Sequence, residues 1–357
     1  MRILYIDQMT PYGHINFNQI YISGLLKAGA ELSIVCSKEY VDKLDLPSAI
    51  VALVYPKFLS HVNKGGIRDR ITFFLRLIYI RFFLDLSAYD MLLFSSYEEL
   101  SFYCGMIRQR SFLINHANIQ GFASNSIKRY FAKKISKKNV QIVFNDVMKR
   151  KLQEWSIENV IVCPHGFSKP YSLDKLEKTS IYRIARIPDD VKIDRVIFSP
   201  SFYSSDFDFI NTILCSESFQ TFLEDSNIVL LIKGVALNNI SNRIYFIDNY
   251  LSSEDYKLLF MNSDFILLCY GSDFSYRVSG VLFECMINNK ICLIKNSLEL
   301  RGYSNYICYD PYFVDVEDLK RKIALLSSCS LKKRYNIDDL YPDFYKFLEE
   351  CQQFLKR

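Results

Sequence analysis

A single carboxylate interrupts an apolar stretch in the second half of the chain. Residues 276–286 read YRVSGVLFECM, which places Glu284 among Val, Leu, Phe, Cys and Met. An ionised carboxylate that is buried without a partner is costly to desolvate. We therefore expect Glu284 either to face a cleft that holds a ligand or to lie on the solvent side of an amphipathic helix.

The residues just before Glu284 have the character of a helix start. Ser279 and Gly280 open the segment, so free backbone N–H groups and the positive end of the helix dipole point at whatever lies before them. Such a helix start suits a diphosphate, and glycine lets the backbone approach it closely. The sequence thus predicts an anion site beside Glu284.

Four histidines are present, and two of them follow apolar runs that predict strands. His14 comes after the first such run, and His116 ends the run SFLINH. An imidazole has a pKa near neutrality and suits general-base catalysis. His14 is thus a candidate base, or a residue that only caps or packs a helix. His165, in VCPHGF, marks the exit from the first half, and His61 lies in a polar loop and is expected at the surface.

The sequence predicts neither a metal site nor a bound organic cofactor. The ten cysteines are scattered without a C-x-x-C pair or zinc spacing, and we expect them to be reduced. The run Asp206 to Asp208 has the D-x-D pattern of some metal sites. We discount it because Asp is also favoured at a helix start, as a cap and by the dipole.

Apolar runs alternate with helix-length segments along the chain, which is typical of βαβ units and parallel sheets. The predicted strands of the first half are 2–7, 31–37, 50–56, 91–96, 111–116, 141–146 and 160–166. Those of the second half are 194–201, 227–234, 243–248, 265–271 and 290–295.

A chain of 357 residues is long for one core and suits two domains. We predict an N-terminal domain over 1–166, a polar linker over 167–193, a second domain over 194–340 and a C-terminal helix over 341–357 that packs back on the first domain. The predicted fold class is α/β, with two doubly wound Rossmann-like domains facing across a cleft at the carboxyl ends of their strands.

The second half resembles the donor domain of GT-B glycosyltransferases, most closely the large retaining family 4. Over residues 250–294 the chain has an S-x-E-x-x-x-L helix, a strand after S-D, a loop with Gly and Ser, a helix ending in E-x-M and a short strand. The resemblance extends over about 190–296, and the first half shares only the architecture. It implies that 194–340 is the nucleotide-sugar-binding domain and that 1–166 is the acceptor-side domain. It implies transfer of a sugar from a nucleotide diphosphate sugar as co-substrate, without a required metal.

The resemblance also implies roles for individual residues. Glu284 takes the place of a carboxylate that accepts hydrogen bonds from the two ribose hydroxyls, and Ser279 and Gly280 lie beside the diphosphate. His116 takes the place of a histidine that contacts the donor sugar. Gly13 and His14, in the pattern G-H-x-N, resemble the acceptor side of inverting GT-B enzymes, in which the histidine is the base.

Two departures from the family pattern affect the donor site. Tyr276 stands where the family has a first Glu, and Asp273 is a candidate to replace that carboxylate. The family's Arg and Lys after the first strand of this domain are absent, so Lys233 and Arg277 are the candidates to offset diphosphate charge. Lys233 could equally be an ordinary lysine at a strand end.

Positive charge is concentrated in the first half of the chain. Residues 1–165 hold 21 Lys and Arg against 13 Asp and Glu, whereas the remainder holds 23 against 26. Segments 68–86 and 128–138 combine this charge with apolar residues, so they predict either a solvated face or attachment to an anionic membrane surface. No nucleic-acid motif accompanies the charge. Without a spanning segment or a signal peptide, we expect a cytoplasmic protein that can be peripheral at the inner face of the cell membrane.

The function predicted from these patterns is glycosyl transfer to an acceptor hydroxyl, with retention of configuration. The acceptor is predicted to be a lipid-linked saccharide in the synthesis of a surface polysaccharide such as capsule, O-antigen or exopolysaccharide. Three alternatives stay open: an inverting GT-B transferase with His14 as base, a nucleotide-sugar epimerase, and a non-catalytic partner of a transferase.

Overall fold

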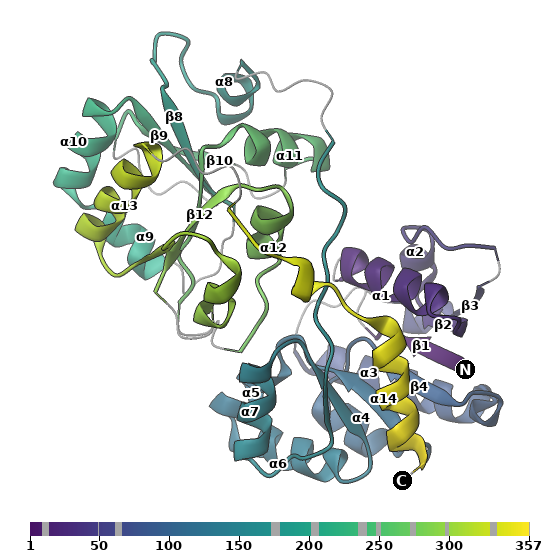
Figure 1. Ribbon diagram of the computed structural model, residues 1–357. Helices are drawn as coiled ribbons and strands as arrows, with labels where there is room; N and C mark the ends of the chain where they lie inside the picture. Colours follow the sequence, from purple (N-terminus) through teal and green to yellow (C-terminus); the bar gives the residue numbers. More distant parts are fainter. Residues whose placement is uncertain are drawn as a thin grey trace. The chain divides into compact units, whose positions relative to one another are not determined.

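The computed structural model describes residues 1–8, 14–48, 50–60, 66–172, 179–200, 207–234, 241–247, 251–271, 276–296, 300–328 and 334–356. The chain forms two compact units (Figure 1). The first unit comprises Met1–Ser168, Tyr276–Val278 and Asp339–Arg357, and the second comprises Lys169–Ser275 and Ser279–Asp338.

The first unit is built on a parallel sheet of seven strands in the order β3-β2-β1-β4-β5-β6-β7. The strands are β1 Arg2–Ile6, β2 Glu31–Cys36, β3 Val51–Val54, β4 Met91–Phe94, β5 Ser111–Ile114, β6 Val140–Val143 and β7 Val160–Val162. The helices are α1 Ile15–Lys27, α2 Lys38–Val41, α3 Ile67–Phe83, α4 Glu99–Gly105, α5 Asn118–Ser124, α6 Ser126–Ser136, α7 Asp146–Glu154 and α14 Phe344–Lys356.

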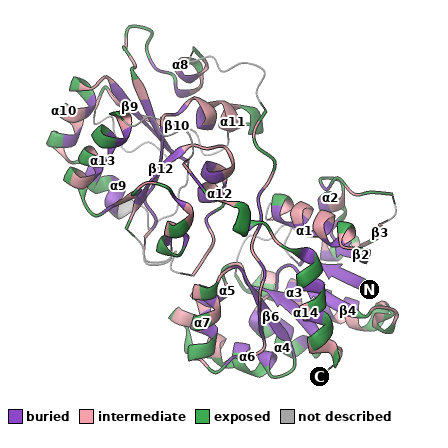
Figure 2. Cartoon of the chain, viewed as in Figure 1, coloured by how far each residue is buried: buried purple, intermediate pink, exposed green. Residues whose placement is uncertain are grey.

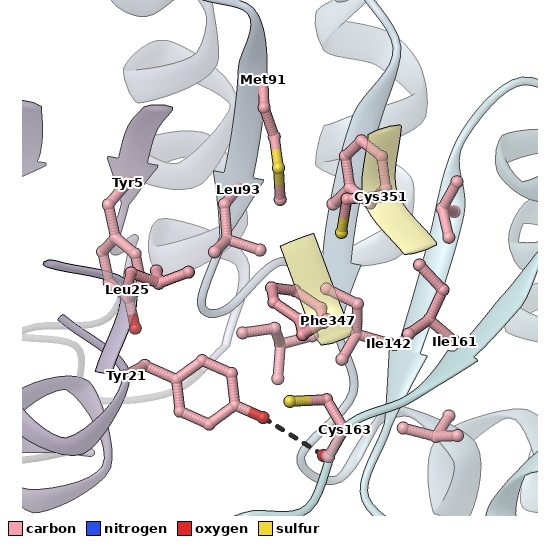
Figure 3. Packing of buried hydrophobic residues seen from close by; sticks show 14 of the residues in the cluster. Tyr5, Tyr21, Leu25, Met91, Leu93, Ile142, Ile161, Cys163, Phe347 and Cys351 are labelled. Atoms are coloured by element: carbon pink, nitrogen blue, oxygen red, sulfur yellow. Dashed lines mark hydrogen bonds between the residues drawn. The ribbon is translucent and has the colours of Figure 1, made fainter. Parts of the chain in front are cut away.

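Strand β1 shows how the alternation of side chains divides the core between the two faces of this sheet. Ile3 and Tyr5 join one apolar cluster, and Leu4 and Ile6 join the other. The first cluster also contains residues of α1 and α14, and the Tyr21 hydroxyl donates to the Cys163 carbonyl within it, as Figure 3 shows. Figure 2 shows both sheets as largely buried.

A glycine allows α14 to approach α1 within the first unit. A Cβ atom placed on Gly24 would lie 2.0 Å from the Phe344 ring. Phe344 also packs edge-on against Tyr21, with ring centroids 5.1 Å apart. The C-terminal helix is therefore part of the first core, although it follows the whole second unit in sequence.

The second unit has a parallel sheet of six strands in the order β10-β9-β8-β11-β12-β13. The strands are β8 Arg195–Ser199, β9 Ile228–Lys233, β10 Ile244–Ile247, β11 Phe265–Leu268, β12 Ile291–Lys295 and β13 Tyr312–Phe313. The helices are α8 Thr179–Ala185, α9 Phe207–Leu214, α10 Glu217–Asp225, α11 Ser253–Asn262, α12 Gly280–Ile287 and α13 Val316–Ser328.

The structure confirms the predicted fold class of two doubly wound α/β domains. Each predicted strand range contains or overlaps one observed strand, whereas β13 was not predicted. The stretch 167–193, predicted as a linker, contains helix α8, and residues from Lys169 onward belong to the second unit. Among the helices described, none is both long enough and apolar enough to cross a bilayer.

Candidate functional site

In the first unit, polar side chains gather where the central strands end. Because parallel strands share the edge at which their carboxyl ends lie, residues that follow different strands meet there. Those that follow β1, β4, β5 and β7 are Asp7, Gln8, Ser95, Ser96, Asn115, His116 and His165. Five of these residues, Asp7, Gln8, Ser95, Ser96 and Asn115, are buried.

Three histidines form a compact group at this edge. The rings of His14 and His116 are stacked with centroids 3.8 Å apart, and His165 lies edge-on to His116 at 6.3 Å. Phe17 packs against His116 and His165 at 4.5 and 4.8 Å. The His116 Nε2 atom is 3.0 Å from the Ser95 carbonyl oxygen, and this hydrogen bond fixes the ring. The structure thus brings together two histidines predicted for the site and adds His165.

Burial keeps these imidazoles neutral. It lowers the pKa of His116 well below its usual range, and the neighbouring His14 and His165 lower it further. Burial also lowers the pKa of His165 to about 4. Burial lowers the pKa of His14, although the charge of Asp7 opposes this shift. A neutral imidazole has one donor and one acceptor nitrogen, so each ring can accept a proton.

His14 has two features that an ordinary helix cap lacks. Its backbone is left-handed, with φ of 66°, a conformation that costs energy in a residue other than glycine. Its side chain makes no capping bond to α1, and within the described part of the chain its buried Nδ1 atom has no hydrogen-bond partner. The ring therefore has one nitrogen without a partner among the described residues. Gly13, predicted beside it on the acceptor side, lies outside the described residues.

Sequence reasoning missed Asp7 and Gln8 at the same edge. Asp7 is 1% exposed and accepts hydrogen bonds from the Ser96 hydroxyl at 3.0 Å and from Asn18. Gln8 is fully buried, and both atoms of its side-chain amide lack a partner within the described residues. Their position directly after the first predicted strand was the signal that could have identified them.

In the second unit, Glu284 lies half-buried on α12. The Tyr256 hydroxyl donates to Oε2 of Glu284 at 2.6 Å, and Tyr171 forms a second side-chain hydrogen bond with the carboxyl group. Burial raises the pKa of Glu284, whereas the two tyrosines and the charge of Lys233 lower it. Glu284 is therefore not the solvent-facing residue of an amphipathic helix. A carboxylate can accept about four hydrogen bonds, which leaves capacity for two hydroxyls of a ligand.

The start of α12 is capped and sterically open. The Ser279 Oγ atom accepts a hydrogen bond from the Leu282 N–H at 3.0 Å and lies 2.7 Å from the Tyr270 hydroxyl. Gly280, the first residue of the helix, is exposed, and a Cβ atom added to it would meet no atom within 4 Å. The predicted helix start is confirmed, and its first residue is open to solvent.

Lys233 ends strand β9 and is half-buried. Its Nζ atom lies 6.0 Å from the centre of the Tyr256 ring, and its charge acts on Glu284. Lys233 and Glu284 therefore both lie next to Tyr256.

The remaining predicted donor-site residues are not gathered with Glu284 in this way. Tyr276 and Arg277 group with the first unit. The Lys151 ammonium lies 5.6 Å from the centre of the Tyr276 ring, and the buried Nε atom of Arg277 has no partner among the described residues. Asp273 lies outside the described residues. Within those residues, no group of three or more His, Cys, Asp or Glu side chains could hold a metal ion.

Comparison with solved structures places this fold among the GT-B proteins. HepE of Anabaena, solved with UDP and glucose, is 12% identical, with a TM-score of 0.64 and coverage of 99% of each chain. The UDP-GlcNAc 2-epimerase of Methanocaldococcus jannaschii is 12% identical, with a TM-score of 0.58 and coverage of 99% of this chain and 100% of the epimerase. WaaG, a glycosyltransferase involved in lipopolysaccharide biosynthesis, is 11% identical, with a TM-score of 0.56 and coverage of 100% of this chain and 95% of WaaG.

The GT-B fold is therefore established for this chain, and the family 4 assignment is not. No protein-family model and no curated protein sequence matches the chain.

Proposed function

We propose that this protein is a glycosyltransferase that moves a sugar from a nucleotide diphosphate sugar to an acceptor hydroxyl. The observation that carries the proposal is the arrangement in the second unit, where Glu284, Lys233 and the open start of α12 lie at the edge formed by the carboxyl ends of the strands. Structures of the same fold have been solved with UDP and with UDP-glucose. The donor is accordingly a nucleotide sugar, without a protein-bound metal or other cofactor.

The donor would be held by three different interactions. Glu284 would accept hydrogen bonds from the vicinal ribose hydroxyls, while Tyr256 and Tyr171 keep its carboxyl group in place. The N–H groups at the start of α12 would face the diphosphate, where the helix dipole favours negative charge. Lys233 would offset the charge that develops as the nucleoside diphosphate leaves.

The first unit would supply the acceptor side. His14 is neutral, has a nitrogen without a partner among the described residues and stands at the carboxyl edge of the sheet. These features suit a base that takes the proton of the acceptor hydroxyl. This geometry supports the inverting alternative, whereas the family resemblance implies retention. His116, fixed by the Ser95 carbonyl, would then orient His14 or contact the donor sugar.

Epimerisation of a nucleotide sugar is the second candidate function. It is favoured by the similarity to 2-epimerase structures, whose TM-scores of 0.58 and 0.59 are close to that of HepE. An epimerase would convert the nucleotide sugar without an acceptor, and a non-catalytic partner would bind it without converting it.

A ligand screen followed by product analysis tests the proposed function. Thermal unfolding is measured with UDP-, GDP-, ADP- and TDP-sugars, because a ligand at 100 times its dissociation constant stabilises by about 2.7 kcal/mol. The stabilising sugar is then incubated with and without saccharide acceptors. Acceptor-dependent release of nucleoside diphosphate supports transfer. An isomerised nucleotide sugar without an acceptor establishes the epimerase instead, and no stabilisation by any nucleotide sugar refutes both.

We further propose that the acceptor is lipid-linked and that the first unit binds an anionic membrane. Helix α4 packs against both α3 and α6. These three helices leave apolar side chains exposed, among them Ile71, Phe82, Phe83, Tyr103 and Ile127. Exposed basic residues on or next to the same helices are Arg68, Arg70, Lys133, Lys134, Lys137 and Lys138. A surface with both properties suits an anionic bilayer interface.

Vesicle sedimentation tests this surface. Replacing Lys133, Lys134, Lys137 and Lys138 by Gln should weaken binding to anionic vesicles, at about 1 kcal/mol for each lysine near the surface. It should also reduce the dependence of binding on salt. Replacing Leu325, an exposed apolar residue of the second unit, by Ser is the control and should change nothing. Equal binding of the wild type to anionic and neutral vesicles would refute this part of the proposal.

A further inference from the structure

A polar hollow lies at the edge of the second sheet away from the start of α12. It has a volume of about 220 Å³ and is lined by residues that begin or precede β8, β11 and β12 and by the end of α13. The polar lining residues are Arg195, Asp264, Lys290, Ser327 and Arg334. Ligands of doubly wound sheets usually bind at the carboxyl ends of the strands, so this amino-terminal edge does not belong to the nucleotide site.

Positive charge exceeds negative charge in this hollow, with three basic side chains against one carboxylate. The Oδ2 atom of Asp264 already accepts the Val196 N–H at 2.8 Å. Burial lowers the pKa of Lys290, and the charge of Arg334 lowers it further, while Asp264 raises it. The basic groups are therefore only partly compensated by the protein itself.

Several hydrogen-bond donors in the hollow are unused. The buried Nε atom of Arg334 and the buried hydroxyl of Ser327 have no partner within the described residues. Over the same residues, the Arg195 guanidinium forms no side-chain hydrogen bond or ion pair. Buried donors of this kind are normally satisfied, by protein, water or a bound ion. Their presence beside three cations indicates an anion with several acceptor oxygens.

We propose that this hollow binds the phosphate group of a small phosphate monoester. A phosphate dianion would balance the net charge of the lining and could accept hydrogen bonds from both arginines and Ser327. The hollow is smaller than the roughly 300–1,000 Å³ that is typical of pockets for larger organic ligands. An adjoining hollow of about 280 Å³ shares Arg195 and Ser327 and is also lined by Phe222, Ile228 and Ile323. The organic part of the ester would occupy that apolar hollow.

Calorimetric titration with two probes tests the proposal. Inorganic phosphate and phenyl phosphate are titrated into the protein at fixed ionic strength, with chloride as the reference anion. We expect saturable binding of both, with phenyl phosphate at least about tenfold tighter because its ring enters the apolar hollow. Equal affinities would mean that the site takes free phosphate alone, which retains the phosphate site and removes the ester.

Two substitutions that leave the apolar core unchanged test whether phosphate binds in this hollow. Arg195→Gln and Ser327→Ala should each weaken phosphate binding, by about tenfold for the arginine and less for the serine. Lys192→Gln, which removes an exposed charge of the same unit outside the hollow, should leave it unchanged. Binding that responds equally to all three substitutions, or that chloride reproduces, would overturn the proposal. UDP binding should not respond to Arg195→Gln, so this test is independent of the proposed function.

Discussion

The histidine group of the first unit and Glu284 of the second lie at corresponding edges of two parallel sheets, and burial acts on both. In the first unit burial dominates, and the rings of His14, His116 and His165 are kept neutral. In the second, two tyrosine hydroxyls and Lys233 oppose burial and support the charged form of Glu284. Desolvation therefore leaves unprotonated imidazoles in one domain, whereas hydrogen bonds and a nearby charge offset it at the carboxyl group in the other.

The largest expected effect concerns His14. If it is the base, His14→Ala should reduce turnover at least about 100-fold, the lower end of typical general-base contributions, and leave UDP affinity unchanged. Because Ala is strained at the left-handed backbone of this position, His14→Asn is measured beside it, since Asn tolerates that conformation.

Loss of turnover in both variants attributes the effect to the imidazole. Recovery in His14→Asn would mean that only the backbone matters. A loss below about tenfold in both would favour retention, and the anomeric configuration of the product, determined by NMR, decides between the two mechanisms.

The next effect concerns the carboxylate. Glu284→Ala should weaken UDP binding about 10- to 100-fold, because two charge-assisted hydrogen bonds are lost. Glu284→Gln should cost less, since one acceptor oxygen remains. Glu254→Ala, at an exposed position of α11, is the matched control. If Glu284→Ala and the wild type have the same UDP affinity, Glu284 does not contact the nucleotide.

Acid should affect the two regions with opposite sign. The pKa of His165 falls from 6.5 in the unfolded chain to about 4, so the unfolded state binds the proton more readily. Stability is therefore lost as the pH falls below 6.5, by about 2 kcal/mol at pH 5 for this one residue. The pKa of Glu284 is raised, so its cost to stability is present at neutral pH and disappears as the pH falls through that pKa.

Urea unfolding at pH 7 and pH 5 measures the balance. We expect lower stability at pH 5, and His165→Gln should reduce the difference because Gln does not titrate. A difference between the two pH values that is the same in His165→Gln and in the wild type would show that His165 is not buried in neutral form.

The smallest effect is expected at the start of α12. Gly280→Ala should leave the fold intact and stabilise it by up to about 1 kcal/mol, because Ala is the better helix former and its Cβ meets no atom. The same methyl group should hinder a diphosphate that approaches the helix start, with a loss of UDP affinity of about tenfold. Thermal unfolding with and without UDP measures both. Unchanged UDP affinity would show that the diphosphate does not lie at the start of α12.

Much of the fold was predictable because buried parallel strands appear in sequence as short, continuous apolar runs. The run FILLCYG predicted β11, and KICLIK predicted β12. Strand β13 has only Tyr312 and Phe313, which is too short for a pattern. Helix α8 has only seven residues and lies in a charged stretch between Pro170 and Pro188, so its helical periodicity was too short to recognise.

The site was predictable in type more than in detail. Glu284 was identified by its isolation in an apolar run, and Ser279 by its place before a helix. The hydrogen-bond partners of Glu284 could not be identified from the sequence. Tyr171 and Tyr256 are 113 and 28 positions away from it, and each is one of 25 tyrosines. His165 was also ranked below His14 and His116, yet all three rings lie together.

The sequence by itself determined the two parallel α/β sheets, the capped start of α12 and the candidate residues at the strand ends, because these follow from local periodicity and from capping. Only the tertiary structure decided the protonation of those residues. The pKa of a side chain depends on burial and on charges and donors brought from distant segments, as Ser95 is brought to His116 and Tyr256 to Glu284. The sequence identifies the histidines and Glu284 only as candidates. The fold makes the imidazoles neutral in one domain and gives the carboxyl group its hydrogen bonds in the other.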